Sequence, residues 1–118
     1  MDSEHEKINY VELSSADIGA TQRFHSKVFG WQLEGFGPEY TAFSGTGLDG
    51  DFYLASMQSR SRDGAALIVL YNKDLTETQN KITAAGSLVV KSCFDFPGGR
   101  RFHFEDATGN ELAVWSER

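Results

Sequence analysis

A few side chains in this sequence have the chemistry for acid–base catalysis or for holding a charged ligand. Glu12 could act as a general base or as the counter-charge of a cationic ligand. Its alternative is a structural carboxylate neutralised by Arg100, Arg101 or a nearby backbone amide. His103 could transfer a proton or make a hydrogen bond, with a structural histidine as its alternative. The elements that position these residues decide between the two readings of each.

The histidines of the chain do not form a recognisable metal motif. His5 lies in an acidic N-terminal segment, and His25 is predicted to belong to helix packing or to the protein surface. That leaves His103 with Glu12 or Glu111 as a conceivable ligand set, without the regular spacing that marks a metal site.

Composition excludes several classes of protein. The chain has 118 residues, with 11 Lys+Arg against 17 Asp+Glu and a net charge of -6. This length allows one domain or two small halves that share a core, and we predict a single domain over residues 1–118. The acidic balance argues against a nucleic-acid surface, which needs clustered basic residues.

Membrane and secretory classes are also excluded. The longest apolar run, residues 65–71, is far shorter than the ~20 residues of a membrane-spanning helix. The charged N-terminus does not resemble a secretory signal. A lone cysteine, Cys93, cannot form an internal disulfide and has no visible activating base, so we expect it to behave as a small apolar residue. A reducing cytoplasm is therefore predicted.

The chain contains an internal repeat. The segment from Val11 to Gln22 recurs as the segment from Ile68 to Gln79, in the order strand, turn and helix. Each half then reaches a glycine that ends its helix, Gly30 or Gly86. A repeat of about half the chain predicts two modules of the same construction.

Each module is predicted to have the order βαβββ. Residues 8–14 alternate in polarity as a strand does, and Asp17 and Asp74 supply helix starts. The later strands are placed at 31–36, 40–44 and 50–56, and at 87–94, 100–105 and 111–116. The chain is therefore predicted as an α+β protein with modules at about 7–56 and 65–116 and a mobile linker at 57–64.

A sheet with a helix on one side only leaves its other face bare. Two such faces can turn toward each other and form a cleft for a small ligand, or they can pack as a core. The bare face of the first strand carries Tyr10 and Glu12, which are costly to bury without partners. Phe52, Tyr53 and Trp115 could add aromatic walls to such a cleft or be plain core residues.

Three stretches of sequence point to a known family. They are Ile8-Asn9-Tyr10-Val11-Glu12-Leu13, then Lys27-Val28-Phe29-Gly30-Trp31, and the strand, turn and strand from Pro97 to Trp115 with Asp106-Ala107-Thr108-Gly109-Asn110 at the turn. Over about residues 7–116 the chain resembles the vicinal oxygen chelate superfamily, the group of glyoxalases, bleomycin resistance proteins and extradiol dioxygenases. The resemblance implies curved mixed sheets around a cavity, with the helices on the convex side. It also implies a homodimer.

The resemblance implies positions for a metal ion as well. Enzymes of this superfamily bind a divalent metal through one residue from the first and the last strand of each module, commonly His, Glu or Gln. Those positions correspond here to Tyr10, Leu67, Ala113 and, in the last strand of the first module, Tyr53 or Leu54. None of these is a usual ligand for such an ion, so neither a metal nor a cofactor is predicted.

The face that His103 occupies depends on the turn before Glu111. A four-residue turn pairs Phe104 with Glu111 and sends His103 to the helix side. A five-residue turn pairs His103 with Ala113, which by family position faces the cavity together with Arg101. Both registers stay open, because a shift of one residue reverses the face of every side chain in a strand.

Three classes of function remain. The first is a metal-independent small-molecule-binding protein of the bleomycin-resistance type that sequesters a drug or metabolite, and an acidic cavity favours a cationic ligand. The second is a glyoxalase-type lyase, isomerase or dioxygenase, either metal-dependent or using an acid–base residue alone. The third is a partner-binding module without a small ligand. We predict the first, with the ligand-binding residues Tyr10, Glu12, Phe52, Tyr53, Arg101, His103, Glu111 and Trp115.

Overall fold

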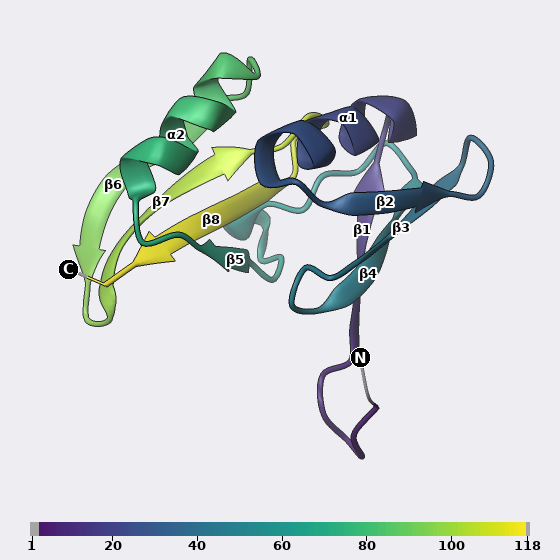
Figure 1. Cartoon of the computed structure of the whole chain (residues 1–118), viewed down its shortest axis with the longest axis horizontal. Helices are drawn as coiled ribbons and strands as arrows, with labels where there is room; N and C mark the ends of the chain where they lie inside the picture. Colours follow the sequence, from purple (N-terminus) through teal and green to yellow (C-terminus); the bar gives the residue numbers. More distant parts are fainter. Residues whose placement is uncertain (1–2, 118) are drawn as a thin grey trace. The chain divides into compact units, whose positions relative to one another are not determined.

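The chain folds as two units of the same construction in the computed structural model, which describes residues 3–117. The boundary lies between Met57 and Gln58. The N-terminal unit contains β1 (Tyr10–Ser15), α1 (Ile18–Phe29), β2 (Gln32–Gly35), β3 (Tyr40–Ser44) and β4 (Asp49–Leu54). The C-terminal unit contains the short 3₁₀ helix η1 (Ser61–Asp63), β5 (Ile68–Tyr71), α2 (Leu75–Ala84), β6 (Val89–Phe96), β7 (Gly99–Glu105) and β8 (Glu111–Ser116) (Figure 1).

Both units have the same sheet topology. The strand orders are β1-β4-β3-β2 and β5-β8-β7-β6, so the first and last strands of each unit are neighbours. That pair is parallel, and the remaining pairs are antiparallel. The predicted α+β fold of two βαβββ modules is confirmed. No helix within residues 3–117 is long and apolar enough to cross a membrane.

The helices begin where the sequence predicts. The carboxylate of Asp17 accepts a hydrogen bond from the backbone N–H of Ala20 at 3.1 Å, and that of Asp74 accepts one from Glu77 at 3.1 Å. These caps satisfy N–H groups that have no partner inside the helix. Gly30 ends α1 in the left-handed conformation, with φ of 70°.

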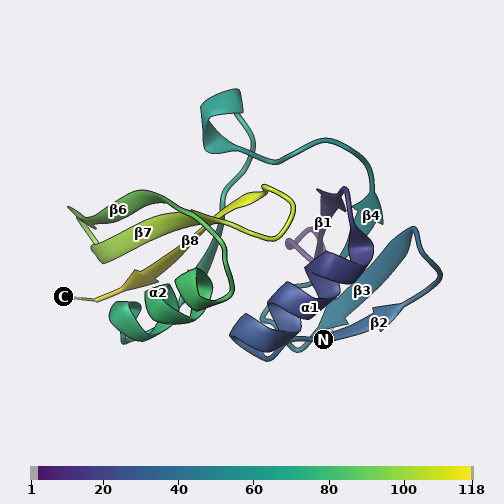
Figure 2. The same ribbon diagram turned by 90° about the horizontal axis from the view of Figure 1, so that it is seen from above.

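Helix α1 covers one face of its sheet and forms an aromatic core with it (Figure 2). Phe52 of β4 is fully buried, with its ring centroid 4.9 Å from that of His25 in α1. His25 also stacks on Trp31 at 4.9 Å. Phe52 therefore belongs to the helix-covered face, and the expectation that it lines a ligand wall is wrong. The alternation along β4 that buries Phe52 puts Asp51 and Tyr53 on the opposite face.

Helix α2 covers the second sheet in the same way. Ile82 of α2 is fully buried. The sheet residues with at most 1% of their surface exposed are Phe102, Phe104, Leu112 and Val114. The intervening residues of β7 and β8 occupy the helix-free face because successive side chains of a strand point to opposite sides. They are Arg101, His103, Glu111, Ala113 and Trp115.

The turn between β7 and β8 settles the register of His103. Glu105 pairs with Glu111 and His103 pairs with Ala113, so the turn is the five-residue form. The carboxylate of Asp106 accepts a hydrogen bond from the backbone N–H of Asn110 at 2.9 Å, which stabilises this turn. His103 consequently lies on the helix-free face.

Part of the segment predicted as a mobile linker is hydrogen-bonded to the C-terminal unit. The backbone N–H of Ser59 donates to the Asn110 side chain at 2.9 Å, and Glu111 donates its own N–H to the Ser59 carbonyl at 2.8 Å. Two backbone N–H groups are satisfied in this way, one of them at the start of β8. In the same segment, Ser61 lies next to the Glu111 carboxylate and donates its backbone N–H to it.

Gly50 gives a test of the packing between β1 and β4. A Cβ at this position would overlap the carbonyl oxygen of Val11 and would lie 2.6 Å from the Phe43 ring. We expect Gly50→Ala to lower the free energy of unfolding by about 1–3 kcal/mol, the usual cost of overpacking. Gly35→Ala is the control, because its new methyl group meets only the end of the Gln22 side chain at 3.1 Å. Urea unfolding measures both variants, and equal midpoints would contradict the close approach at Gly50.

Candidate functional site

The helix-free face of the N-terminal unit carries two carboxyl groups side by side. Glu12 of β1 pairs in register with Asp51 of β4 in the parallel ladder. Tyr10 lies two residues before Glu12 and shares its face. The cluster therefore joins a residue that the sequence singled out, Glu12, with Asp51, which it did not.

Asp51 is buried and only half satisfied. Its side chain is 1% exposed, and its Oδ2 accepts a hydrogen bond from the Tyr10 hydroxyl at 2.9 Å. The Tyr10 hydroxyl also lies 3.1 Å from that of Tyr40. While both carboxyl groups are ionised, Asp51 Oδ1 has no hydrogen-bond partner. A buried carboxylate oxygen without a donor is costly, so this atom is ready to accept one.

Asp51 changes the protonation of both neighbours. It holds the pKa of Glu12 above its usual range, first because a protonated Glu12 can donate a hydrogen bond to Asp51 and then because the two charges repel each other when both groups are ionised. The pKa of Tyr10 is also raised, chiefly by its hydrogen bond to Tyr40, then by burial and by Asp51. Tyr10 therefore stays protonated and donates.

No basic side chain neutralises this carboxyl pair in the part of the chain that the structure describes. Arg100, one alternative partner of Glu12, instead pairs with Asp95, with Nε 3.9 Å from Oδ1. Neither Glu12 nor Asp51 forms an ion pair among residues 3–117. The cluster therefore offers negative charge to a ligand.

An open pocket of about 440 Å³ begins at Tyr10 in the same unit. Its lining adds two further carboxylates, Glu34 and Asp49, beside the small side chain of Ala42. Tyr53 is 39% exposed and shares the helix-free face with Asp51, so a third tyrosine borders the acidic cluster. The surroundings of Asp51 thus combine carboxylates with phenol rings.

The register of the strands corrects the repeat alignment at Asp51. Val11 pairs with Gly50 in the first unit, and its repeat counterpart Ile68 pairs with Leu112 in the second. The next residues, Asp51 and Ala113, are therefore equivalent. The expected counterpart, Tyr53 or Leu54, was wrong, because the parallel pairing places Asp51 opposite Glu12 in the first unit and Ala113 opposite Val69 in the second. Asp51 is the one acidic residue in the strand predicted at 50–56, and this is the signal that could have revealed it.

The donor set does not fit a divalent metal centre. At the positions that the family uses, Asp51 supplies one ordinary ligand, while Leu67 and Ala113 supply none. Tyr10 holds its proton, as its raised pKa indicates. Within residues 3–117 no group of three or more His, Cys, Asp or Glu side chains is arranged to hold a metal ion.

A hydrogen-bonded histidine and glutamate lie on the helix-free face of the C-terminal unit. His103 is 5% exposed, and its Nδ1 lies 2.7 Å from Oε2 of Glu111. Glu111 Oε1 also accepts from the backbone N–H and the hydroxyl of Ser61, at 2.8 and 2.9 Å. Burial pushes the pKa of Glu111 up, but the hydrogen bonds from His103 and Ser61 outweigh it and hold this pKa below its usual value.

Aromatic rings flank this pair. The Arg101 guanidinium lies 5.2 Å from the ring centroids of both Phe94 and Phe96. Trp115 packs edge-on against Phe96 at 6.2 Å and against Tyr71 at 5.1 Å. The structure therefore brings the predicted residues Arg101, His103, Glu111 and Trp115 to one face, and Tyr10, Glu12 and Tyr53 to the corresponding face of the other unit.

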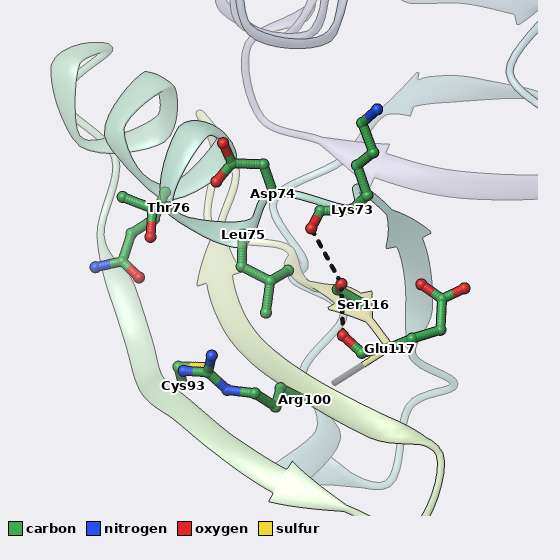
Figure 3. Close-up of a pocket in the computed structure, with 9 residues that line it drawn as sticks. Lys73, Asp74, Leu75, Thr76, Cys93, Arg100, Ser116 and Glu117 are labelled. Carbon is green, nitrogen blue, oxygen red and sulfur yellow. Dashed lines mark hydrogen bonds between the residues drawn. The ribbon is translucent and has the colours of Figure 1, made fainter.

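A larger pocket, of about 830 Å³, opens at the start of α2 (Figure 3). Lys73, Cys93 and Arg100 line it, and the Ser116 hydroxyl donates to the Lys73 carbonyl at 3.3 Å. None of the predicted site residues takes part in its lining. Its charges are of both signs, and Asp74 and Ser116 already bond backbone groups of the chain, so it is a weaker candidate than the two sheet faces.

The family model of the Glyoxalase/Bleomycin resistance protein/Dioxygenase superfamily matches residues 7–114. The chain belongs to this superfamily. The match agrees with the two βαβββ units and with the resemblance carried by the strand motifs. No curated protein sequence matches the chain significantly.

Solved structures of the superfamily share the fold. A mutant fosfomycin resistance protein from Listeria monocytogenes has a TM-score of 0.78 at 18% identity, covering 98% of this chain and 93% of its own. A glyoxalase-related enzyme from Fulvimarina pelagi has a TM-score of 0.76 at 18% identity, with coverage of 95% and 88%. Lactoylglutathione lyase from Agrobacterium tumefaciens has a TM-score of 0.72 at 18% identity, with coverage of 96% and 95%. At this identity the likeness is one of fold.

The carboxyl pair predicts a specific pH dependence. The pKa of Glu12 is raised above the ordinary value of 4.5 in the folded chain. The folded protein then binds more protons than the unfolded chain, so Glu12 lowers stability as pH rises from 4.5 through its folded pKa. We expect Asp51→Asn to bring the pKa of Glu12 down and to shrink this loss. An NMR titration of the Glu12 side-chain carboxyl measures the first effect, and urea unfolding across the same pH range measures the second.

Asp49→Asn is the matched control for this titration. It removes a carboxylate two residues away on the same strand, and Asp49 is not among the causes of the raised pKa. Glu12 should titrate in this variant as it does in the native chain. An unchanged titration of Glu12 in Asp51→Asn would contradict the pairing.

Proposed function

We propose that the chain is a metal-independent small-molecule-binding protein of the glyoxalase/bleomycin resistance type, and that its ligand is an organic cation. The observation that carries the proposal is the Asp51 carboxylate, which is 1% exposed and has an Oδ1 atom without a hydrogen-bond partner. A cation or a cationic N–H donor at this atom would remove the cost of leaving it unpaired.

The neighbours of Asp51 favour a positive charge rather than a neutral donor. Glu12 and Asp49 add carboxyl groups on the same sheet face, and the whole chain carries a net charge of -6. The phenol rings of Tyr10 and Tyr53 suit a cation as well, because the negative face of an aromatic ring attracts positive charge. Tyr10, which donates to Asp51, also lines the neighbouring pocket of about 440 Å³, whose volume is usual for small-molecule sites.

The enzyme alternative has weaker support. The Listeria relative is described in complex with Mn(II) and dihydroxypropylphosphonic acid. Asp51 is the one ordinary ligand among the residues of this chain at the family's metal positions, so the support here is for binding without a metal. The proposal extends to a cytoplasmic homodimer that does not bind nucleic acid, on the strength of the family resemblance, the lone cysteine and the acidic charge.

A thermal-shift experiment tests the ligand class. We expect benzyltrimethylammonium to raise the melting temperature of the native chain, while its neutral analogue benzyl alcohol does not. A ligand present at a hundredfold excess over its Kd stabilises a protein by about 2.7 kcal/mol. Asp51→Asn should abolish the shift and Glu12→Gln should reduce it, because each removes charge from the face that holds the cation.

Glu39→Gln is the control, since it removes an exposed carboxylate from the turn before β3. Its shift should equal that of the native chain. Circular dichroism verifies that each variant is folded before the comparison. Equal shifts for native and Asp51→Asn protein would remove Asp51 from the site, and equal shifts with benzyl alcohol would overturn the cationic class.

Elemental analysis tests the independence from metal. We expect the purified chain to contain no stoichiometric Ni, Zn, Fe or Mn, because the donor set offers too few ligands. The measurement is made on protein purified without chelators. A stoichiometric metal that is lost on Asp51→Asn would overturn this part of the proposal.

A further inference from the structure

Two buried polar atoms without partners lie on the helix-free face of the C-terminal unit. Arg101 and His103 are two residues apart on β7, so their side chains share this face. The Nε of Arg101 and the Nε2 of His103 are both buried, and neither has a hydrogen-bond partner in the described chain. Buried polar atoms in native proteins are nearly always paired, so two exceptions on one face point to a ligand that completes them.

Glu111 determines what His103 can offer. The pKa of Glu111 is held below its usual value, so its carboxylate is ionised and can only accept hydrogen bonds. The His103 Nδ1, 2.7 Å from Glu111 Oε2, must therefore carry the proton of this hydrogen bond. In the neutral imidazole the other nitrogen, Nε2, is then an acceptor. To this neutral form of His103 a ligand must offer a donor at Nε2, such as a hydroxyl group.

Arg101 requires a hydrogen-bond acceptor from the ligand, because a guanidinium has only donors. Its guanidinium lies over the rings of Phe94 and Phe96, and it forms no ion pair with a carboxylate among residues 3–117. Contacts with the two rings do not use its N–H groups as hydrogen-bond donors to an anion, so these groups remain available to a ligand. The edge of a guanidinium matches the planar geometry of a carboxylate.

We propose that Arg101 and His103 bind a small organic acid that carries a hydroxyl group next to its carboxylate. The Arg101 N–H groups donate to the carboxylate, and the ligand hydroxyl donates to His103 Nε2. The rings of Phe94, Phe96 and Trp115 lie beside these groups and suit an apolar substituent. The contacts come from the C-terminal unit alone and do not depend on the proposed binding of organic cations.

A pair of matched probes tests the hydroxyl group. Phenyllactate carries a hydroxyl beside its carboxylate, and 3-phenylpropanoate is the same molecule without it. We expect phenyllactate to shift the ring resonances of His103 in NMR spectra and to leave those of His5 and His25 in place. We expect 3-phenylpropanoate to bind about tenfold more weakly, because the acceptor at Nε2 then stays unpaired.

Variants of neighbouring arginines test the carboxylate contact. Arg101→Gln should weaken the binding of phenyllactate by about tenfold or more, since it removes the charged partner of the ligand carboxylate. Arg100→Gln is the control, because Arg100 is the next residue on the same strand, points to the other face and pairs with Asp95. Equal losses in the two variants would show general charge attraction and overturn the site.

Variants of the histidine pair test its role. His103→Phe keeps a ring of similar shape but has no acceptor, so phenyllactate should lose its advantage over 3-phenylpropanoate. Glu111→Gln tests the same point without replacing the ring, because a neutral amide no longer dictates the tautomer of His103. The preference for the hydroxylated acid should shrink while binding to Arg101 persists. A full preference in Glu111→Gln, or an unmoved His103 ring in the native chain at millimolar probe, overturns the proposal.

Discussion

The pairing register within each sheet is the constraint on which both candidate sites depend. A helix covers only one face of each sheet, so the parity of a residue along its strand decides whether it joins the core or the helix-free face. Phe52 and Asp51 are neighbours in sequence, yet one packs against α1 and the other meets Glu12. A slip of one residue would exchange their places and leave a carboxylate in the aromatic core.

The internal repeat gives two units with the same arrangement of strands and helix caps but with different side chains on their helix-free faces. Glu12 and Asp51 form a carboxyl pair in the first unit, and the equivalent register pair in the second is Val69 and Ala113. The buried polar atoms without partners in the second unit lie on the adjacent strand β7 instead, at Arg101 Nε and His103 Nε2. The framework of strands and caps has therefore been retained while the helix-free faces have diverged.

Neighbouring groups, rather than residue type, determine the charge state of the two glutamates. The pKa of Glu12 is raised by the carboxyl group of Asp51, whereas that of Glu111 is lowered by donors from His103 and Ser61. Glu12 therefore holds its proton more readily than an ordinary glutamate, and Glu111 is an ionised acceptor of the hydrogen bond from His103. The same side chain thus has a raised pKa in one unit and a lowered pKa in the other.

The sequence by itself determined the local elements and the family. The repeat, the caps at Asp17 and Asp74 and the alternation along the strands each depend on residues a few positions apart, so they can be read without coordinates. Only the tertiary structure decided which side chains meet: the burial of Asp51 beside Tyr10, the five-residue turn that places His103, and the bond from Ser61 to Glu111. These contacts join residues up to 50 positions apart, and the register that brings them together is set by whole sheets packing against their helices.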